Sequence, residues 1–305
     1  MPSQYASTSP LEELHVLMED GATWQMIFKD LSPESVSRSN CNMRPSFLRD
    51  PLREIETYRH FLRHERRGAA HCYGASVDES CGRYWLFLEK VDGEELYTIG
   101  EYRIWKDVAR WLARMHQDAA DRLRATPPVK QWLKYDANYF RIWLARARDM
   151  SRGAESVVRT LGRLADRYEY IVQRLDALPV TLIHGECYAS HVLVSSARPS
   201  GRGMVAVDWE LAGIGTGLLD LAALISGRWT SLERRAMALA YFEALDDEAA
   251  TAYSSAEDFL NAVDHCRLQL AIQWLGWSAN WRPPADHDHD WFNDVLELGD
   301  VLGCL

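Results

Sequence analysis

The chain has 305 residues, of which 47% are hydrophobic and 26% charged, and this composition is typical of a soluble globular protein with one large domain or two smaller ones. Its formal net charge of −10 argues against a nucleic acid or an anionic membrane as partner and is compatible with a cationic substrate. The six cysteines form no CxxC pair, residues 1–5 lack a secretion signal, and no apolar run approaches the roughly 18 residues of a membrane helix, so we expect a cytoplasmic protein with reduced thiols.

The first third of the chain carries strand patterns. Residues 15–18 and 24–29 are apolar runs on either side of Asp20-Gly21, a dipeptide that favours a hairpin turn. Lys29 closes the second run. The sequence therefore predicts a β-hairpin with an ammonium group at the end of its second strand.

A helix is predicted after the polar residues 32–42. Asp50 supplies an N-cap and Pro51 a first-turn proline. The apolar residues that follow recur with helical spacing and give the helix one buried face: Leu52, Ile55, Tyr58, Phe61 and Leu62.

A boundary between two lobes is predicted near residue 90. Residues 84–88 form a short aromatic and aliphatic strand, and residues 89–93 have the polar and glycine character of a connector. We therefore expect a nucleotide-binding lobe over residues 1–90 and a catalytic and substrate-binding lobe over residues 91–305.

Helical patterns dominate the second lobe. They run through residues 105–115 and 137–177, and they return after the two strands predicted within residues 184–210 and continue to the end of the chain. A small strand-rich first third and a large, mostly helical remainder predict a two-lobed α+β protein.

The segments 184–194 and 204–210 carry the most chemistry. The first is a loop with Glu186 at its third position, followed by a short strand, and the second is a strand that ends in Asp208. A Gly/Ser/Pro-rich turn joins them. This layout places two carboxylates at neighbouring strand ends, which suits phosphoryl transfer from a metal nucleotide.

These motifs resemble the aminoglycoside phosphotransferase and choline kinase-like family, which shares the protein-kinase fold. The segments that carry the resemblance span nearly the whole chain: 28–31, 53–58, the loop at 184, 207–210, 213–215, 219–222 and 274–277. The resemblance implies a small β-rich N-terminal lobe and a larger, mostly helical C-terminal lobe that together bind ATP.

The resemblance also implies a lysine–glutamate pair that positions the nucleotide. Lys29 would contact the α- and β-phosphates, held by a glutamate from the predicted helix. Both Glu54 and Glu56 could serve, but a turn of about 100° per residue places Glu54 nearer the buried stripe. We therefore predict Glu54 as the partner of Lys29.

Three further residues are predicted at the nucleotide. Glu89 to Val91 would present the backbone edge that holds adenine. No glycine-rich loop precedes the first strand, and Ser7 in a serine-bearing segment would approach the phosphates instead, with a frayed tail as the alternative interpretation.

The resemblance assigns Asp208 to the metal and Glu186 to the acceptor hydroxyl, which Glu186 would orient and deprotonate. The family usually carries aspartate where this chain has Glu186 and asparagine where it has His191. Because imidazole suits softer ions than Mg²⁺, three interpretations of His191 stay open: the second metal is lost, Mn²⁺ or another ion replaces it, or His191 hydrogen-bonds a phosphate. Asp220 is expected to brace the loop through backbone hydrogen bonds, and His184 to be a satisfied buried histidine.

The sequence thus predicts an ATP-dependent phosphotransferase that uses Mg²⁺, with Mn²⁺ as the alternative, to phosphorylate a hydroxyl of a small molecule. An aminoglycoside or other amino-sugar, a choline-like alcohol, a natural-product intermediate and a Ser or Thr of a peptide precursor all stay open as acceptors. The departures at Glu186 and His191 motivate a second hypothesis, a catalytically impaired kinase-like module that binds a nucleotide or a partner protein. The oligomeric state is not predicted.

Overall fold

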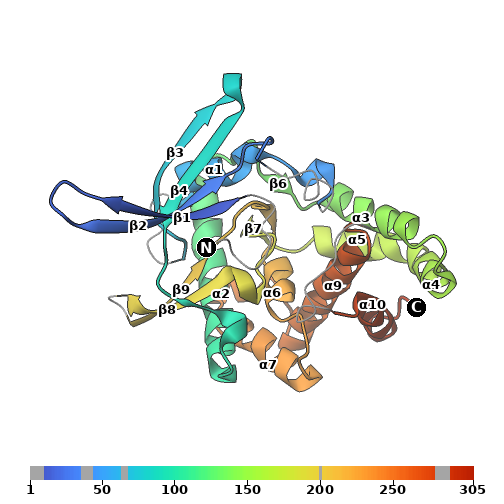
Figure 1. Cartoon of the computed structure of the whole chain (residues 1–305). Helices are drawn as coiled ribbons and strands as arrows, with labels where there is room; N and C mark the ends of the chain where they lie inside the picture. Colours follow the sequence, from blue (N-terminus) through green and yellow to red (C-terminus); the bar gives the residue numbers. More distant parts are fainter. Residues whose placement is uncertain (1–9, 36–43, 63–67, 199–200, 279–288) are drawn as a thin grey trace. The chain divides into compact units, whose positions relative to one another are not determined.

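The computed structural model describes residues 10–35, 44–62, 68–198, 201–278 and 289–305 and has the predicted α+β class (Figure 1). The chain divides into two compact units. The first comprises Met1–Ile99, Val129–Trp132 and Ala189–Ala212, and the second comprises Gly100–Pro128, Leu133–Tyr188 and Gly213–Leu305. This division is discontinuous along the chain, and the predicted lobe boundary after residue 90 stays a prediction.

A four-stranded antiparallel sheet begins the first unit. Its strands are β1 (Leu11–Leu17), β2 (Thr23–Asp30), β3 (Cys72–Asp78) and β4 (Arg83–Glu89), in the order β1-β2-β4-β3. The predicted hairpin turn is confirmed, because Gly21 has a φ of 84° and the Asp20 carboxylate accepts a hydrogen bond of 2.9 Å from the Ala22 N–H. The register places Lys29 opposite Leu86 in the centre of the sheet.

Helix α1 (Pro51–His60) packs against β3 and β4 (Figure 1). The predicted cap is present, since the Asp50 side chain accepts a 2.9 Å hydrogen bond from the Leu52 N–H and Pro51 opens the first turn. Ile55 and Tyr58 are fully buried. A 3₁₀ turn, Ser46–Leu48, leads into this helix.

A second small sheet in the first unit carries the segment that ends in Asp208. It consists of β5 (Glu94–Glu95), β8 (Val192–Arg198) and β9 (Gly201–Ala206), in the order β5-β8-β9. The Ala206 N–H donates a 2.9 Å hydrogen bond to the Gly68 carbonyl. These pairings fix the backbone just before Asp208.

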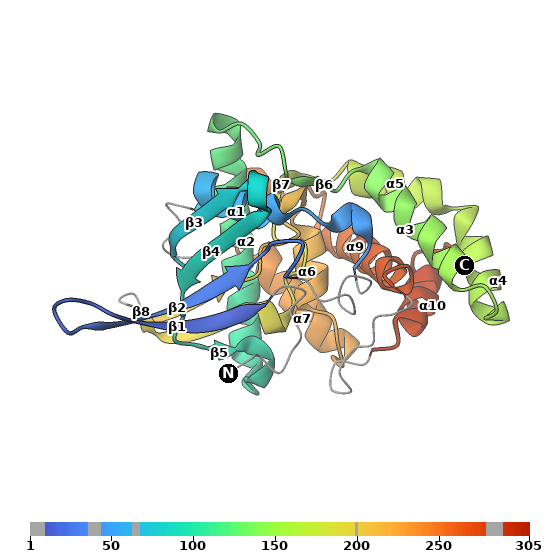
Figure 2. The same cartoon turned by 45° about the horizontal axis from the view of Figure 1, so that its top comes forward.

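The second unit is mostly helical. Its helices are α2 (Tyr102–Ala125), α3 (Ala137–Met150), α4 (Glu155–Ala165), α5 (Tyr168–Asp176), α6 (Leu218–Leu224), α7 (Ser231–Phe242), α8 (Asp247–Ala250), α9 (Ala256–Leu275) and α10 (Trp291–Val301). Helix α9 packs against α3, α5, α6, α7 and α10 (Figure 2). Side chains all around this helix are therefore buried. No helix in the described ranges is long and apolar enough to cross a bilayer.

A three-stranded sheet positions the loop that carries Glu186. Its strands are β6 (Leu133–Lys134), β7 (Val180–Ile183) and β10 (Gly213–Thr216), in the order β6-β10-β7. The Glu186 loop follows β7 directly.

Gly213 of β10 is required by close packing. A Cβ at this position would lie 2.5 Å from the Leu133 carbonyl oxygen and 2.7 Å from a ring carbon of Tyr135. We therefore expect Gly213→Ala to lower the free energy of unfolding by about 1–3 kcal/mol in urea denaturation followed by circular dichroism. A Cβ at Gly162 in α4 would meet no atom within 4 Å, so Gly162→Ala should instead stabilise by about 0.5–1 kcal/mol. Equal stabilities of the two variants would contradict this packing argument.

Candidate functional site

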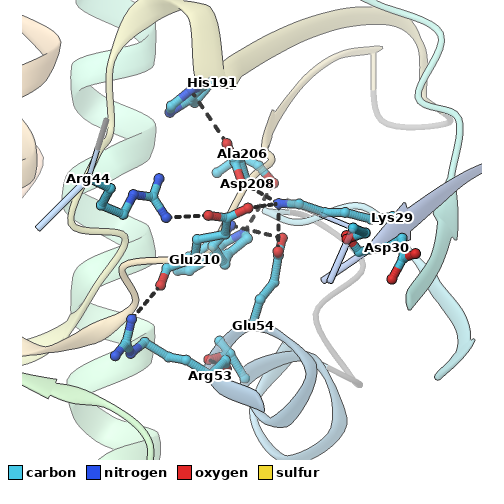
Figure 3. Close-up of polar contacts among 12 residues, drawn as sticks. Lys29, Asp30, Arg44, Arg53, Glu54, His191, Ala206, Asp208 and Glu210 are labelled. Carbon is cyan, nitrogen blue, oxygen red and sulfur yellow. Dashed lines mark hydrogen bonds and ion pairs between the residues drawn. The ribbon is translucent and has the colours of Figure 1, made fainter. Parts of the chain in front are cut away.

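The Lys29 ammonium lies among three carboxylates in the first unit (Figure 3). Its Nζ is 2.6 Å from Glu54 Oε2 and 2.9 Å from Glu210 Oε1, and it also donates to Asp208 Oδ1. The Lys29 side chain is 3% exposed and that of Glu54 1%. Glu54 and Asp208, which the sequence predicted to act on one nucleotide together with Lys29, thus both contact its ammonium.

Three segments bring these groups together. Lys29 is the second-to-last residue of β2, Glu54 lies in the first turn of α1, and Asp208 and Glu210 follow β9. The Trp209 N–H, between the two acids, donates a 3.1 Å hydrogen bond to Glu54 Oε1. The pair Lys29–Glu54 and the segment after β9 are therefore held as one structure.

Buried Arg53 ties the acidic segment to α1. Its Nη1 donates 2.8 Å hydrogen bonds to the carbonyls of Glu210 and Leu48, and its Nε donates one of 2.8 Å to the carbonyl of Gln131. Figure 3 shows Arg53 reaching Glu210 from the helix that also presents Glu54. A guanidinium with several fixed donors suits this role.

The backbone of Asp208 is left-handed. Its φ is 68°, and among the described residues it is the only non-glycine residue with a positive φ. Aspartate and asparagine tolerate this conformation better than most residues, although it still costs of order 1–3 kcal/mol. Such strain at a carboxylate in contact with a buried lysine is compatible with the predicted role of Asp208, which stays a prediction.

The charged groups in the cluster shift one another's pKa values. Burial alone would lower the pKa of Lys29, but Asp208, Glu210 and Glu54 outweigh burial and raise it well above its usual value. Burial would raise the pKa of Asp208 and of Glu210, but the Lys29 ammonium, together with Arg44, lowers both. Lys29, Asp208 and Glu210 are therefore all charged at neutral pH.

Glu54 behaves differently. Burial raises its pKa, the charges of Asp208 and Glu210 raise it further, and Lys29 opposes them only in part, so that the pKa of Glu54 is about 7. Of the three acids that share one ammonium, Glu54 is therefore the one that keeps a proton to the highest pH.

The cluster fits a divalent metal. Carboxylate oxygens of Glu54, Asp208 and Glu210 lie within 4.8 Å of one another, and oxygen ligands of this kind suit Mg²⁺. His191 is not one of these three; its Nε2 lies 3.8 Å from Asp208 Oδ2, beyond hydrogen-bonding distance (Figure 3). The geometry favours metal binding by Asp208, whereas the assignment of His191 stays a prediction.

The loop that carries Glu186 belongs to the second unit and is braced by Asp220. The Asp220 carboxylate accepts hydrogen bonds from the N–H groups of His184 at 2.7 Å and Gly185 at 2.8 Å, as predicted. Fully buried His184 accepts a 3.2 Å hydrogen bond at Nδ1 from the Glu186 N–H, so it is the satisfied histidine that was expected. Asp220 also pairs with His116 Nε2 at 3.1 Å. Glu186 itself is 8% exposed, and its catalytic role stays a prediction.

The predicted adenine and phosphate contacts are placed only in part. Glu89 is the last residue of β4. Its carboxylate accepts a 3.0 Å hydrogen bond from the His71 N–H, and its own N–H donates one of 2.7 Å to the His71 carbonyl. Val91 follows in an irregular connector and is itself half-buried, whereas Lys90, Asp92 and Gly93 beside it are exposed. Ser7 lies outside the described residues. The roles of these three residues remain predictions.

Two members of the cluster, Glu210 and Arg44, have no role in the sequence-based prediction. Arg44 Nη1 donates to Glu210 Oε2, on the far side of the carboxylate from Lys29 (Figure 3). Glu210 was recognisable, since it stands two residues after Asp208 in the same motif. Arg44 lies in a polar stretch without a pattern, 166 residues from its partner, and nothing in the sequence pointed to it.

An aromatic cluster lies in the second unit. Trp274 Nε1 donates a 2.7 Å hydrogen bond to the Tyr188 hydroxyl, and Trp274 stacks on Trp291 at 5.6 Å between ring centroids. Trp277 is buried and stacks on Trp143 at 5.7 Å. Trp277 is thus a core residue, whereas half-buried Trp274 and Trp291 keep part of their surface accessible.

Comparison with known sequences identifies the family. The sequence profile of the phosphotransferase enzyme family matches residues 17–259, well over half of the chain. No curated protein matches the chain in sequence.

Solved structures of kinases share the fold. An ethanolamine kinase of Plasmodium vivax superposes with a TM-score of 0.55 and 12% identity, covering 97% of this chain and 82% of its own. A choline kinase of Streptococcus pneumoniae superposes with a TM-score of 0.54 and 13% identity, covering 97% of this chain and 93% of its own. An amicoumacin kinase in complex with AMP-PNP and Ca²⁺ superposes with a TM-score of 0.54 and 14% identity, covering 98% of this chain and 86% of its own. Identities this low show the fold alone, and they confirm the predicted kinase-like α+β fold.

Titration of Glu54 should be visible in the stability of the ligand-free protein. The folded-state pKa of about 7 lies above the ordinary 4.5, so this group contributes stability that is fully present below pH 4.5 and is lost as pH rises through about 7. Glu54→Gln does not titrate. The free energy of unfolding of the wild type minus that of the variant should therefore fall by up to about 3 kcal/mol between pH 4.5 and 7, measured by urea denaturation with EDTA present.

Glu56→Gln, on the same helix, is the matched control for this measurement. Glu56 pairs with Arg59 and His60 at the surface. The difference in free energy of unfolding between the wild type and Glu56→Gln should therefore change by no more than about 1 kcal/mol over the same pH range. A constant or rising difference for Glu54→Gln would contradict proton binding at Glu54.

Proposed function

The chain belongs to the phosphotransferase enzyme family, and we propose that it transfers the γ-phosphoryl group of ATP to a hydroxyl of a small cationic molecule. The chain is accordingly a phosphotransferase with an alcohol group as acceptor. The observation that carries the proposal of an ATP donor is the Lys29 ammonium held by Glu54 and by the acids Asp208 and Glu210. A buried ammonium beside metal-binding carboxylates is the arrangement that phosphoryl transfer requires.

Lys29 changes partners in the proposed reaction. With nucleotide bound, its ammonium would contact the phosphates and keep Glu54 as its anchor, while Asp208 and Glu210 would hold Mg²⁺. The metal supplies positive charge that stabilises the phosphate oxygens. The amicoumacin kinase of the same fold, with AMP-PNP and Ca²⁺, supports a triphosphate donor and a divalent ion.

Glu186 handles the acceptor. Its carboxylate orients the hydroxyl and accepts the hydroxyl proton as the oxygen forms a bond to the γ-phosphorus. The bond from the γ-phosphorus to the β–γ bridging oxygen breaks, and ADP leaves with that electron pair. The brace from Asp220 to the backbone of His184 and Gly185 supports this role, because it fixes the loop backbone directly before Glu186.

A cationic acceptor is supported by two features of the chain. The net charge is −10, and the second unit presents the half-buried rings of Trp274 and Tyr188, whose centroids are 5.8 Å apart. Aromatic faces attract ammonium groups through cation–π contacts. The structural neighbours named as ethanolamine and choline kinases agree with an amino alcohol as acceptor.

Glu186→Gln should remove turnover and keep nucleotide binding. We expect kcat to fall about 10²–10⁴-fold, because the amide does not accept the proton, while thermal stabilisation by ATP and Mg²⁺ is retained. ADP release over a panel of amino alcohols and aminoglycosides measures the first effect, and a thermal-shift titration the second. Asp208→Asn is the complementary variant, since asparagine tolerates the left-handed backbone and lacks the charge; it should lose the metal-dependent stabilisation. ADP release by Glu186→Gln at the wild-type rate would rule out this role.

Trp274→Leu should affect cationic acceptors selectively. Loss of a cation–π contact of about 1–2 kcal/mol predicts a rise in KM of roughly 5- to 30-fold for an ammonium-bearing alcohol, with kcat nearly unchanged. An uncharged alcohol of the same size should show little change in KM. Trp277→Leu is the control for packing, because this buried ring should affect stability and not the preference between the two alcohols. Equal effects of Trp274→Leu on both alcohols would argue against a cation site.

A further inference from the structure

Two cations share the Glu210 carboxylate. Lys29 Nζ lies 2.9 Å from Oε1, and Arg44 Nη1 donates to Oε2. The Arg44 side chain is 12% exposed and that of Glu210 9%, so both charges are largely removed from solvent. Figure 3 shows the two cations reaching Glu210 from different sides.

The backbone at Arg44 is anchored separately from its guanidinium. The Arg44 carbonyl accepts a 2.8 Å hydrogen bond from Arg49 Nη2, and the 3₁₀ turn Ser46–Leu48 begins just after Pro45. A change of partner by the guanidinium therefore requires rotation of the side chain alone.

The Arg44–Glu210 pair conflicts with the metal role proposed for Glu210. A divalent ion at this carboxylate would place two further positive charges beside a poorly solvated guanidinium, and their repulsion weakens the ion pair. The nucleotide brings anionic oxygens to the Lys29 ammonium, which forms an ion pair with the other oxygen of the same carboxylate. A planar guanidinium binds phosphate oxygens in pairs, more strongly than an ammonium does.

We propose that Arg44 is a second phosphate-binding residue, which exchanges Glu210 for the phosphates of the donor nucleotide when that nucleotide binds. The inference rests on the proposed function. In the ligand-free protein Arg44 is paired with Glu210. With nucleotide bound, Lys29 and Arg44 both neutralise the triphosphate.

The test measures binding without turnover, in the Glu210→Gln background. There Arg44 has no Glu210 charge to neutralise, so any further loss of affinity on changing Arg44 reports on its contact with the ligand. We expect Arg44→Gln added to Glu210→Gln to weaken the binding of ATP with Mg²⁺ by about 10- to 100-fold in isothermal titration calorimetry without an acceptor. Adenosine, which lacks phosphates, should bind both proteins equally. The ATP affinity of the Arg44→Lys variant should lie between the affinities of the Glu210→Gln background and the Arg44→Gln variant. Lysine keeps the positive charge but lacks the paired N–H donors of the planar guanidinium.

Arg59→Gln in the same background controls for the lost positive charge. Arg59 lies on α1 in the same unit, with a side chain 38% exposed and paired with Glu56, so ATP affinity should stay within about 2-fold. Melting temperatures report whether each variant folds. If Arg44→Gln does not fold, the ATP affinity of Arg44→Lys is compared with that of the Glu210→Gln background instead.

Two results would overturn the assignment of Arg44. One is ATP affinity within about 2-fold of the background for Arg44→Gln and Arg44→Lys alike. The other is an equal loss for ATP and adenosine, which would mark Arg44 as structural. Failure of the proposed function looks different, because the wild-type protein would then bind no ATP with or without metal.

Discussion

The first unit is organised around the need to neutralise one buried ammonium. Lys29 lies in the centre of a sheet at 2% exposure, and an isolated charge there would be strongly unfavourable. Glu54 offsets one positive charge, but Asp208 and Glu210 also contact it, so the cluster carries more acid than the lysine alone requires. This excess has a structural consequence, the raised pKa of Glu54, and a chemical one, a set of oxygens able to bind a cation other than lysine.

The same demand explains the backbone around Asp208. A left-handed aspartate turns the chain so that the next N–H, from Trp209, reaches the second oxygen of Glu54. Arg53, one residue before Glu54, then fixes the Glu210 carbonyl. Contacts from one helix turn thus hold both ends of the acidic segment, and they offset the strain at Asp208.

The sequence predicted the part of the site whose members stand at fixed places in local patterns. Lys29 is the second-to-last residue of a strand, Glu54 lies beside an apolar helical stripe, and Asp208 follows the end of a second strand by two residues, so each is marked by its own neighbourhood. Strand β3 was not predicted, because Cys72–Asp78 lacks a regular apolar alternation and contains a bulge after Cys72. Arg44 was missed for a different reason: its role depends on a contact made only after folding, and arginine in a polar stretch is normally solvated.

The exchange of partners follows from how the cluster distributes its charge. Lys29 and Arg44 are already removed from most of the solvent while they contact carboxylates, so a triphosphate that replaces those carboxylates strips little further water from either cation. In the proposed exchange, the carboxylates that the two cations leave would not stay uncompensated in a poorly solvated site, because a metal bound with the nucleotide would take the place of the cations. Nucleotide without metal would leave Asp208 and Glu210 facing the phosphates with no cation between them, and their repulsion disfavours that state. In the proposed function, the excess of acid around Lys29 would therefore couple metal binding to nucleotide binding, and Arg44 would extend that coupling to a second cation.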